Sequence, residues 1–297
     1  MSIKSEAQSK PQYQDLLDRL EQFPTLPHVV MKVSQLINDP KSSSRDIADI
    51  LKKDQVLTSK VLKLINSSYY SIPGGVTDVQ RALAFLGFNT IAQLVLSVSV
   101  FTLFNAESKA DGFSMTTFWR HALGVAVCSE FLAKKIKYSK PNEAFTCGLL
   151  HDLGKLVLHA IDPNEFNKII AEAQKRKTSY LHIENVFEIP SHSYLGEVIA
   201  TKWNLPESIG LSIRYHHQNI SNVSTITENN KKLIHIVQLS NAICNKNQIG
   251  HSGNYFETKI SSDLLKPIGF ALSDLEPIEI SVKKEIERAG ALLNAYR

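Results

Sequence analysis

The sequence predicts an all-α protein, and three observations support that prediction. Apolar residues recur three and four positions apart along almost the whole chain, which places them on one face of a helix. No stretch shows the strict apolar–polar alternation that is typical of a half-buried strand. Capping and helix-breaking residues fall at the ends of the periodic segments. Apolar residues make up 43% of the 297 residues, so the chain can bury a packed core.

The first part of the chain divides into short amphipathic segments. Residues 1–12 are polar and are expected to form a disordered tail. Periodic segments follow at 13–23, 28–38, 42–53 and 54–68. Asp54 is suited to cap the last of these, and Ser43 with Asp46 is close to a capping box. The sequence IPGG at 72–75 is a break, and Gly87 suits a left-handed helix stop before an apolar helix at 90–104.

The polar segment NAESKADG at 105–112 is the best internal boundary. We therefore expect an N-terminal helical part at 13–108 and a second helical part at 109–297 that ends in a terminal helix. Within the second part, helices are expected near 114–137, 141–159, 163–177, 179–187, 191–203, 206–217 and 231–246.

Charge and composition narrow the class of protein. The net charge of +4 is spread along the chain, without a long basic stripe or interleaved aromatic residues, so nucleic acid is not expected as a partner. The three cysteines form no CxxC motif and suit a reducing compartment, which favours the cytoplasm. The apolar stretch 90–104 is shorter than the roughly 20 residues that a membrane span needs, so we expect a buried helix and no membrane contact.

A histidine and an aspartate stand side by side inside the apolar run GLLHDLGKLVL at 148–158. An ionised carboxylate is costly to bury unless a positive or hydrogen-bonding group meets it. One candidate partner for Asp152 is a divalent cation, because His151 and Asp152 on one helix would point about 100° apart and could both reach one ion. The other is Lys155, because residues three apart on a helix can form an ion pair without a metal.

Further histidines fall inside apolar helical segments, namely His121, His192, His216, His217 and His235. A single histidine of this kind is more often a satisfied core residue than a ligand. The set together with Asp152 favours a metal site, because imidazole and carboxylate are the ligands that Zn, Fe and Mn prefer.

The chain resembles the HDOD family, bacterial signalling proteins with a divergent domain of the HD superfamily of metal-dependent phosphohydrolases. The resemblance lies in seven segments in family order, at 23–33, 51–70, 79–91, 118–126, 144–158, 192–209 and 215–217. It implies a multi-helix HD-like domain with an N-terminal helical subdomain.

The resemblance also implies roles for single residues. A metal site is implied at His121, His151 and Asp152, with a second ion at His192 and His216 and with His217 beside them. The ion would be divalent, such as Fe, Mn, Zn, Co or Mg. Lys155 matches a lysine that lies near the phosphate in active relatives, so Lys155 and Asp152 would be catalytic if the protein is an enzyme.

Two departures from the superfamily pattern bear on function. Asn241, in IVQLSNAIC, stands where the superfamily has its last aspartate ligand, and an amide oxygen adds no negative charge. The GYP segment of cyclic-dinucleotide phosphodiesterases is absent after Lys155. Both favour a non-catalytic signal-transduction module that contacts other signalling proteins through its N-terminal helical part and binds a metal or a nucleotide. A metal-dependent phosphohydrolase with a phosphodiester or nucleotide substrate is the alternative.

Overall fold

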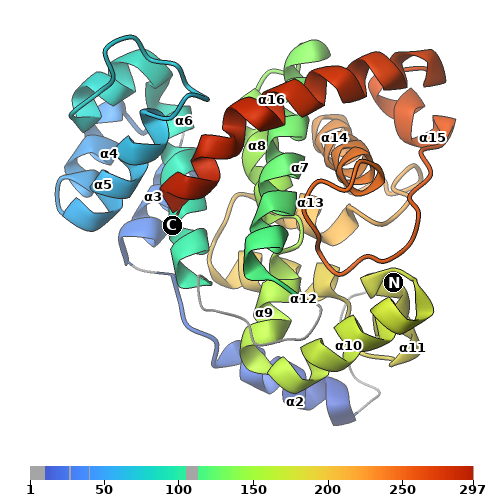
Figure 1. Ribbon diagram of the computed structural model, residues 1–297. Helices are drawn as coiled ribbons and strands as arrows, with labels where there is room; N and C mark the ends of the chain where they lie inside the picture. The colour runs from blue at the N-terminus through green and yellow to red at the C-terminus, as the bar shows by residue number, and fades with distance from the viewer. Residues whose placement is uncertain (1–10, 27, 40, 105–112, 297) are drawn as a thin grey trace.

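The computed structural model confirms the all-α prediction. It describes residues 11–26, 28–39, 41–104 and 113–296, with side chains for those between 14 and 290, and these residues include no strand (Figure 1). The α-helices are α2 (Pro11–Glu21), α3 (His28–Asn38), α4 (Ser44–Leu51), α5 (Gln55–Ile65), α6 (Val79–Leu103), α7 (Met115–Lys135), α8 (Pro141–Leu150), α9 (Leu153–Ile161), α10 (Pro163–Arg176), α11 (Tyr180–Val186), α12 (His192–Lys202), α13 (Glu207–Tyr215), α14 (Glu228–Lys246), α15 (Ser262–Leu265) and α16 (Leu275–Tyr296).

Helices α3 to α6 fall in the range predicted for the N-terminal helical part, and α4 and α5 begin at the predicted caps. Asp54 accepts a hydrogen bond from the backbone N–H of Leu57 at 2.9 Å, and Asp46 accepts one from the backbone N–H of Ser43 at 2.8 Å. Gly87 has the expected left-handed backbone, with φ 76°, but the chain turns there and continues as a helix. The predicted stop is therefore a kink within α6.

Helix α6 is long and apolar enough to cross a membrane by length and composition alone. In the fold, 67% of its most apolar window is buried, because α3, α4, α5 and α8 pack around it. A core helix passes the same test, so the pattern fits the buried helix expected at 90–104.

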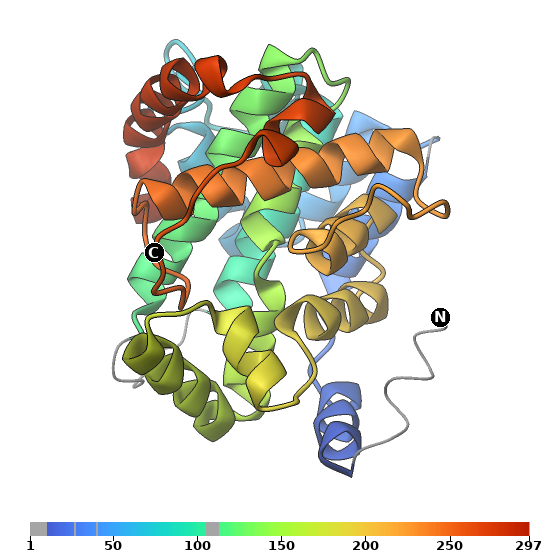
Figure 2. The same ribbon diagram turned by 90° about the vertical axis from the view of Figure 1, so that its right-hand side faces the viewer.

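Helix α7 lies at the centre of the second part and packs against α8, α14 and α16 (Figure 1). Helix α14 crosses α7 at a steep angle (Figure 2). One continuous cluster of buried apolar side chains runs from Leu16 to Ala289, and the three cysteines are buried thiols. The boundary predicted at 105–112 lies outside the described residues, as does most of the predicted tail, since α2 begins at Pro11. The division at residue 108 stays a prediction.

The helix expected at 141–159 is two helices, and this corrects the prediction. Helix α8 ends at Leu150 and α9 begins at Leu153, so His151 and Asp152 link the two. Asp152 has a non-helical backbone with φ −98° and ψ 16°. Nδ1 of His151 donates to the carbonyl oxygen of Gly148 at 2.7 Å. In a continuous helix that carbonyl would accept from a backbone N–H instead. The pair thus lies at a helix junction and not on one helical face.

Candidate metal centre and ligand pocket

Six predicted site residues meet in one buried cluster, although they come from separate elements. The junction between α8 and α9 supplies His151 and Asp152, α7 supplies His121, and α14 supplies Asn241. His192 begins α12 and His216 directly follows α13. All six are buried. The family-based grouping of these residues is therefore reproduced in space.

Glycines allow the close helix packing that brings these residues together. A β-carbon at Gly154, at the start of α9, would lie 1.8 Å from the His192 carbonyl oxygen, so only glycine fits against α12. A β-carbon at Gly148 in α8 would lie 2.8 Å from the Val125 carbonyl oxygen of α7. Asp152 is thereby held between the histidines of α7 and α12.

Asp152 is the centre of the cluster, and its two oxygens have different surroundings. Oδ2 accepts a hydrogen bond from Lys155 Nζ at 2.8 Å and lies 3.3 Å from Nε2 of His151. Oδ1 lies 3.4 Å from Nε2 of His192 and 3.5 Å from Nε2 of His216. Lys155 therefore meets one oxygen, as the ion-pair hypothesis predicts, while the other oxygen faces imidazole nitrogens.

The partners of Nδ1 fix which nitrogen of each histidine carries the hydrogen. Nδ1 of His151 and of His216 each lies 2.7 Å from a backbone carbonyl, of Gly148 and Ile213 respectively. Nδ1 of His192 lies 2.8 Å from a carboxylate oxygen of Glu184. These oxygens can only accept, so Nδ1 donates and Nε2 of a neutral ring presents a lone pair.

The inner surface of the cluster is consequently a set of acceptors that face one another. Nε2 of His192 and Nε2 of His216 are 3.4 Å apart, and both point at Oδ1 of Asp152. Nε2 of His151 and Oδ1 of Asp152 are buried without a hydrogen-bond donor. Facing lone pairs in a buried site require a proton or a cation between them.

The charges of the cluster also indicate that a proton or a cation is needed. Burial lowers the pKa of His121 to about 3 and that of His216 to about 4, so both rings are neutral. Burial would raise the pKa of Asp152, but Lys155, His151 and His192 together outweigh it and hold that pKa well below its usual value. Burial also lowers the pKa of His192, but Glu184 and Asp152 outweigh it, so the net pKa is raised.

Two carboxylates, Asp152 and Glu184, and one ammonium, Lys155, are thus buried together. Neutral histidines leave one negative charge in excess. A proton on His192 or a bound cation would supply the missing positive charge.

The cluster has two sides that share Asp152. The α12 side consists of His192, His216 and His217, and the α7 side consists of His121, His151 and Asn241. Each residue offers one nitrogen or oxygen that could bind a metal. These atoms lie within 4.8 Å of one another in Asp152 and the three histidines of the α12 side. The same holds for Asp152 and the two histidines of the α7 side. His217 is exposed, and its ring centroid lies 4.0 Å from that of His216.

On the α7 side, Asn241 lies beside His121, at the position that the resemblance assigns to the last ligand. Its Oδ1 is 3.1 Å from Nε2 of His121 and accepts a hydrogen bond from Asn245 Nδ2 at 2.7 Å. Nδ1 of His121 is 3.2 Å from the carbonyl oxygen of Ile249 and donates to it. This side therefore has an amide oxygen where a carboxylate would carry a charge.

The ammonium group of Lys155 is buried and bonded to other groups of the protein. Its Nζ donates to Asp152 at 2.8 Å and to the Ser252 carbonyl at 3.0 Å, and it lies 3.5 Å from the Ser252 hydroxyl. The ammonium also lies 5.1 Å from the centre of the Tyr180 ring, and the side chain is only 1% exposed. Lys155 would have to give up these contacts to reach a phosphate, so the geometry favours a positioning role.

Sequence reasoning missed Glu184 and the segment 249–254. Glu184 accepts from both the backbone N–H and Nδ1 of His192, and its position on the buried face of α11, with Tyr180 and Ile183, was an available signal. The segment 249–254 crosses the α7 side, where a β-carbon at Gly250 would lie 2.2 Å from the backbone nitrogen of His121. Within this segment, only the two glycines indicate a close approach to another part of the chain.

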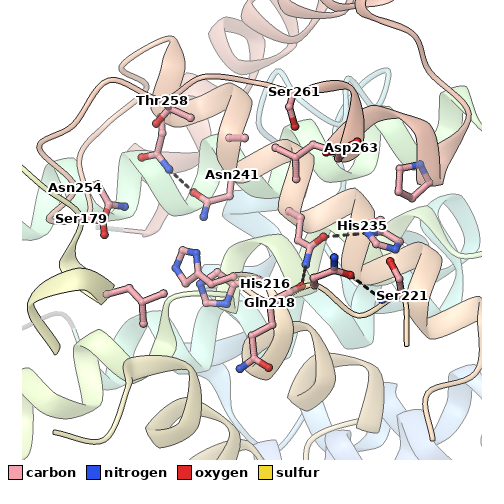
Figure 3. Close-up of a pocket in the computed structure, with 18 of the residues that line it drawn as sticks. Ser179, His216, Gln218, Ser221, His235, Asn241, Asn254, Thr258, Ser261 and Asp263 are labelled. Carbon is pink, nitrogen blue, oxygen red and sulfur yellow. Dashed lines mark hydrogen bonds between the residues drawn. The ribbon is translucent and has the colours of Figure 1, made fainter. Parts of the chain in front are cut away.

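A pocket of about 710 Å³ opens onto the cluster at His216, His217 and Asn241. Half of its lining residues carry amide or hydroxyl groups, as Figure 3 shows for Gln218, Asn254 and Thr258. His235, which the sequence singled out as a further histidine, lies in the pocket wall and not in the cluster, with Nδ1 at 3.0 Å from Oε1 of Gln238. The pocket gives a polar ligand access to the α12 side.

The fold and the cluster define an all-α protein with a buried histidine–aspartate centre beside an open polar pocket. The chain belongs to the HDOD family, because the model of the HDOD domain matches residues 23–219.

The comparisons with individual proteins support the same fold. An uncharacterized protein of Treponema pallidum (strain Nichols) is 25% identical over 241 residues, which are 81% of this chain and 45% of that protein. The chain thus spans under half the length of this curated relative.

Three solved structures share the fold at low sequence identity. An HDOD domain protein of unknown function from Geobacter sulfurreducens has a TM-score of 0.74 at 22% identity, covering 96% of this chain and 99% of that one. A protein from Shewanella amazonensis SB2B, provisionally named a phosphohydrolase, has a TM-score of 0.72 at 23% identity, covering 95% and 98%. A protein from Marinobacter aquaeolei VT8, provisionally named a signal transduction protein, has a TM-score of 0.76 at 18% identity, covering 95% and 65%.

Proposed function

We propose that this protein is a signal-transduction module of HDOD type that binds a divalent transition metal at its histidine–aspartate cluster and a phosphorylated ligand in the adjoining pocket, without turnover. The observation that carries the proposal is the set of facing lone pairs on His192, His216 and Asp152. A cation between them satisfies these acceptors and offsets the excess negative charge.

The donor set indicates which ions fit. Asp152, His192 and His216, with His217, would hold an ion on the α12 side, and His121 and His151 with Asp152 would hold one on the α7 side. Imidazole suits Mn, Fe, Co and Zn, whereas Mg²⁺ prefers oxygen ligands and fits less well. A bound ion would supply a positive centre that attracts and polarises a phosphoryl oxygen.

Two features support binding over catalysis. Asn241 leaves the α7 side with no carboxylate of its own, so a second divalent ion there is poorly neutralised. Lys155 is held by Asp152 and Ser252 and is not presented to the pocket. Partner proteins would contact the N-terminal helical part, where Val56 and Phe85 are 69% and 54% exposed.

A phosphohydrolase is the second candidate, favoured by the open pocket that reaches His216 and Asn241. Such an enzyme would hydrolyse a phosphoester with one water, giving a phosphate-bearing product and an alcohol. The solved structure from Shewanella amazonensis, which is provisionally named a phosphohydrolase, also supports this candidate.

Metal uptake tests the proposal directly. We expect the protein to bind about one or more Mn, Fe, Co or Zn ions per chain after reconstitution, measured by elemental analysis, and Asp152→Ala to bind none. Asp152→Ala also leaves Lys155 buried without its counter-charge, which costs about 3–5 kcal/mol. The double variant Asp152→Ala/Lys155→Met removes that penalty and serves as the folded control.

A wild-type protein that stays metal-free, or a double variant that keeps its metal, would overturn the proposal. Thermal melts give a second readout, since metal at 100 times its Kd stabilises by about 2.7 kcal/mol and a chelator removes this. Assays of phosphodiester and nucleotide substrates with Mn²⁺ decide between the two candidates, because turnover above the Asp152→Ala/Lys155→Met control would establish an enzyme.

A further inference from the structure

A second cavity of about 700 Å³ adjoins the ligand pocket. The two share three wall residues, Ser221, His235 and Pro267. Ser221 and His235 lie at one end of the pocket in Figure 3, with Ser179 and Asn254 at the opposite end. Both cavities are lined by residues of α14, so together they form one groove along this helix, named here the α14 groove.

The second cavity is basic. Lys137, Lys231 and Lys232 line it, together with one carboxylate, Glu228. Glu228 accepts a hydrogen bond from Lys231 at 2.9 Å and offsets one of the three charges. The lining of the ligand pocket contains both Asp263 and Lys266, which offset each other. The α14 groove therefore has the cluster near its middle and a net positive charge at one end.

The ligand pocket also offers groups that bind a sugar and a base. Phe256 lines it with 45% of its surface exposed, which provides an aromatic face for stacking. The Thr258 hydroxyl oxygen is buried in the wall without a hydrogen-bond partner. The amides of Gln218, Asn219 and Asn254 offer both donors and acceptors.

The spacing along α14 sets the length of a ligand that would reach both ends. Asn241 is nine and ten residues from Lys232 and Lys231, which corresponds to about 14 Å at a rise of about 1.5 Å per residue. A stacked strand advances about 3.4 Å per nucleotide, so two phosphates about four nucleotide steps apart span this distance.

We infer that the α14 groove binds a short single-stranded oligonucleotide of about four or five nucleotides, with one phosphate at the histidine–aspartate cluster and another at Lys137, Lys231 and Lys232. This rests on the proposed function, because the first phosphate meets the metal-binding cluster. The sequence excludes a long basic stripe for a polymer, whereas these lysines come from two distant segments that only the fold brings together.

The test uses 5′-phosphorylated oligoadenylates of one to five nucleotides, in ribose and deoxyribose series, titrated into the Mn²⁺-loaded full chain. We expect affinity to rise about tenfold or more from one nucleotide to five. Lys231→Gln/Lys232→Gln abolishes that rise and leaves Mn²⁺ content unchanged. The slope of log K against log salt falls in magnitude by about 0.7, since the variant loses one phosphate contact and each such contact on a single strand contributes about 0.7.

Lys283→Gln/Lys284→Gln on α16 is the matched control, because it removes the same charge from exposed positions of a different helix. An affinity that does not depend on length, or an equal loss in both double variants, overturns this inference. Failure to take up Mn²⁺ overturns the proposed function instead, so the two failures are distinguishable. The series with the stronger length dependence identifies the sugar.

Discussion

The two sides of Asp152 differ in the groups that support their histidines. On the α12 side, Nδ1 of His192 lies 2.8 Å from the buried carboxylate of Glu184. On the α7 side, Nδ1 of His121 lies 3.2 Å from a neutral backbone carbonyl, and its Nε2 faces the Asn241 amide at 3.1 Å. Charged support is therefore confined to one side of a cluster whose two sides share one carboxylate.

This difference indicates that the two sides should bind metal unequally. A carboxylate behind a histidine orients the ring and increases its basicity, which strengthens metal binding. The α12 side has this support and presents two histidines, His216 and His217, to the pocket, where the α7 side presents Asn241. We therefore expect the first ion on the α12 side and a weaker one, or none, on the α7 side.

The largest expected effect follows from crowding of the α7 side at Gly250. A β-carbon there would lie 2.2 Å from the His121 nitrogen and 2.4 Å from the Thr117 oxygen, and the backbone has φ 67°. We expect Gly250→Ala to lower the free energy of unfolding by about 3 kcal/mol, through strain and overpacking. Urea unfolding measures this loss, and metal titration should show the α12 side still occupied.

Gly269→Ala is the matched control for this prediction. Gly269 has φ 83° and nothing within 4 Å of a β-carbon, so alanine there carries only the backbone penalty of about 1–2 kcal/mol. Equal losses in the two variants would show that contact between segment 249–254 and α7 does not support His121.

The sequence was sufficient for features that depend on local spacing. Helical periodicity gave the all-α class, and the Asp54 cap is confirmed because capping involves a backbone group only three residues away. The histidines could be grouped before the structure because they stand in segments that resemble the HDOD family. Asn241 could be added because the resemblance assigns it to the position of the last ligand. The Asp152–Lys155 ion pair followed from a spacing of three residues.

Features that depend on long-range contacts could not be predicted. Ser252 lies 97 residues from Lys155, and no local pattern marks its carbonyl as the acceptor of that ammonium. The tight packing of Gly148 and Gly154, on either side of the break between α8 and α9, is against helices that are distant in the sequence. Glu184 becomes informative only when α11 brings its carboxylate to the start of α12.

Removing the charge behind His192 tests whether support explains the difference between the sides. We expect Glu184→Gln to weaken metal binding on the α12 side by about 10–100-fold, since the ring loses its carboxylate partner. The α7 side should keep its affinity. Isothermal titration with Mn²⁺ and Zn²⁺ measures both sites.

Glu197→Gln provides the comparison for that variant. Glu197 also lies on α12, but its carboxylate is 3.4 Å from Arg214 and away from the cluster. If both variants weaken metal binding to the same extent, the effect comes from α12 as a whole, and the charge on Glu184 has no special role.

The smallest expected effect, and the most specific, comes from giving the α7 side the carboxylate that it lacks. We expect Asn241→Asp to raise metal affinity on the α7 side by about tenfold, because a charged oxygen replaces the amide 3.1 Å from Nε2 of His121. The expected readout is a second ion per chain in the same titration.

Asn245→Asp adds the same charge one turn further along α14, where the side chain contacts Asn241 and not His121. A gain in both variants would mean that a general negative field attracts the ion. A gain in Asn241→Asp alone would mean that direct ligation was lost at this position, and that the α7 side is empty or weak because one carboxylate is missing. If neither variant gains affinity, charge does not explain the difference between the two sides. The difference would then come from the hydrogen bonds that orient the histidine rings.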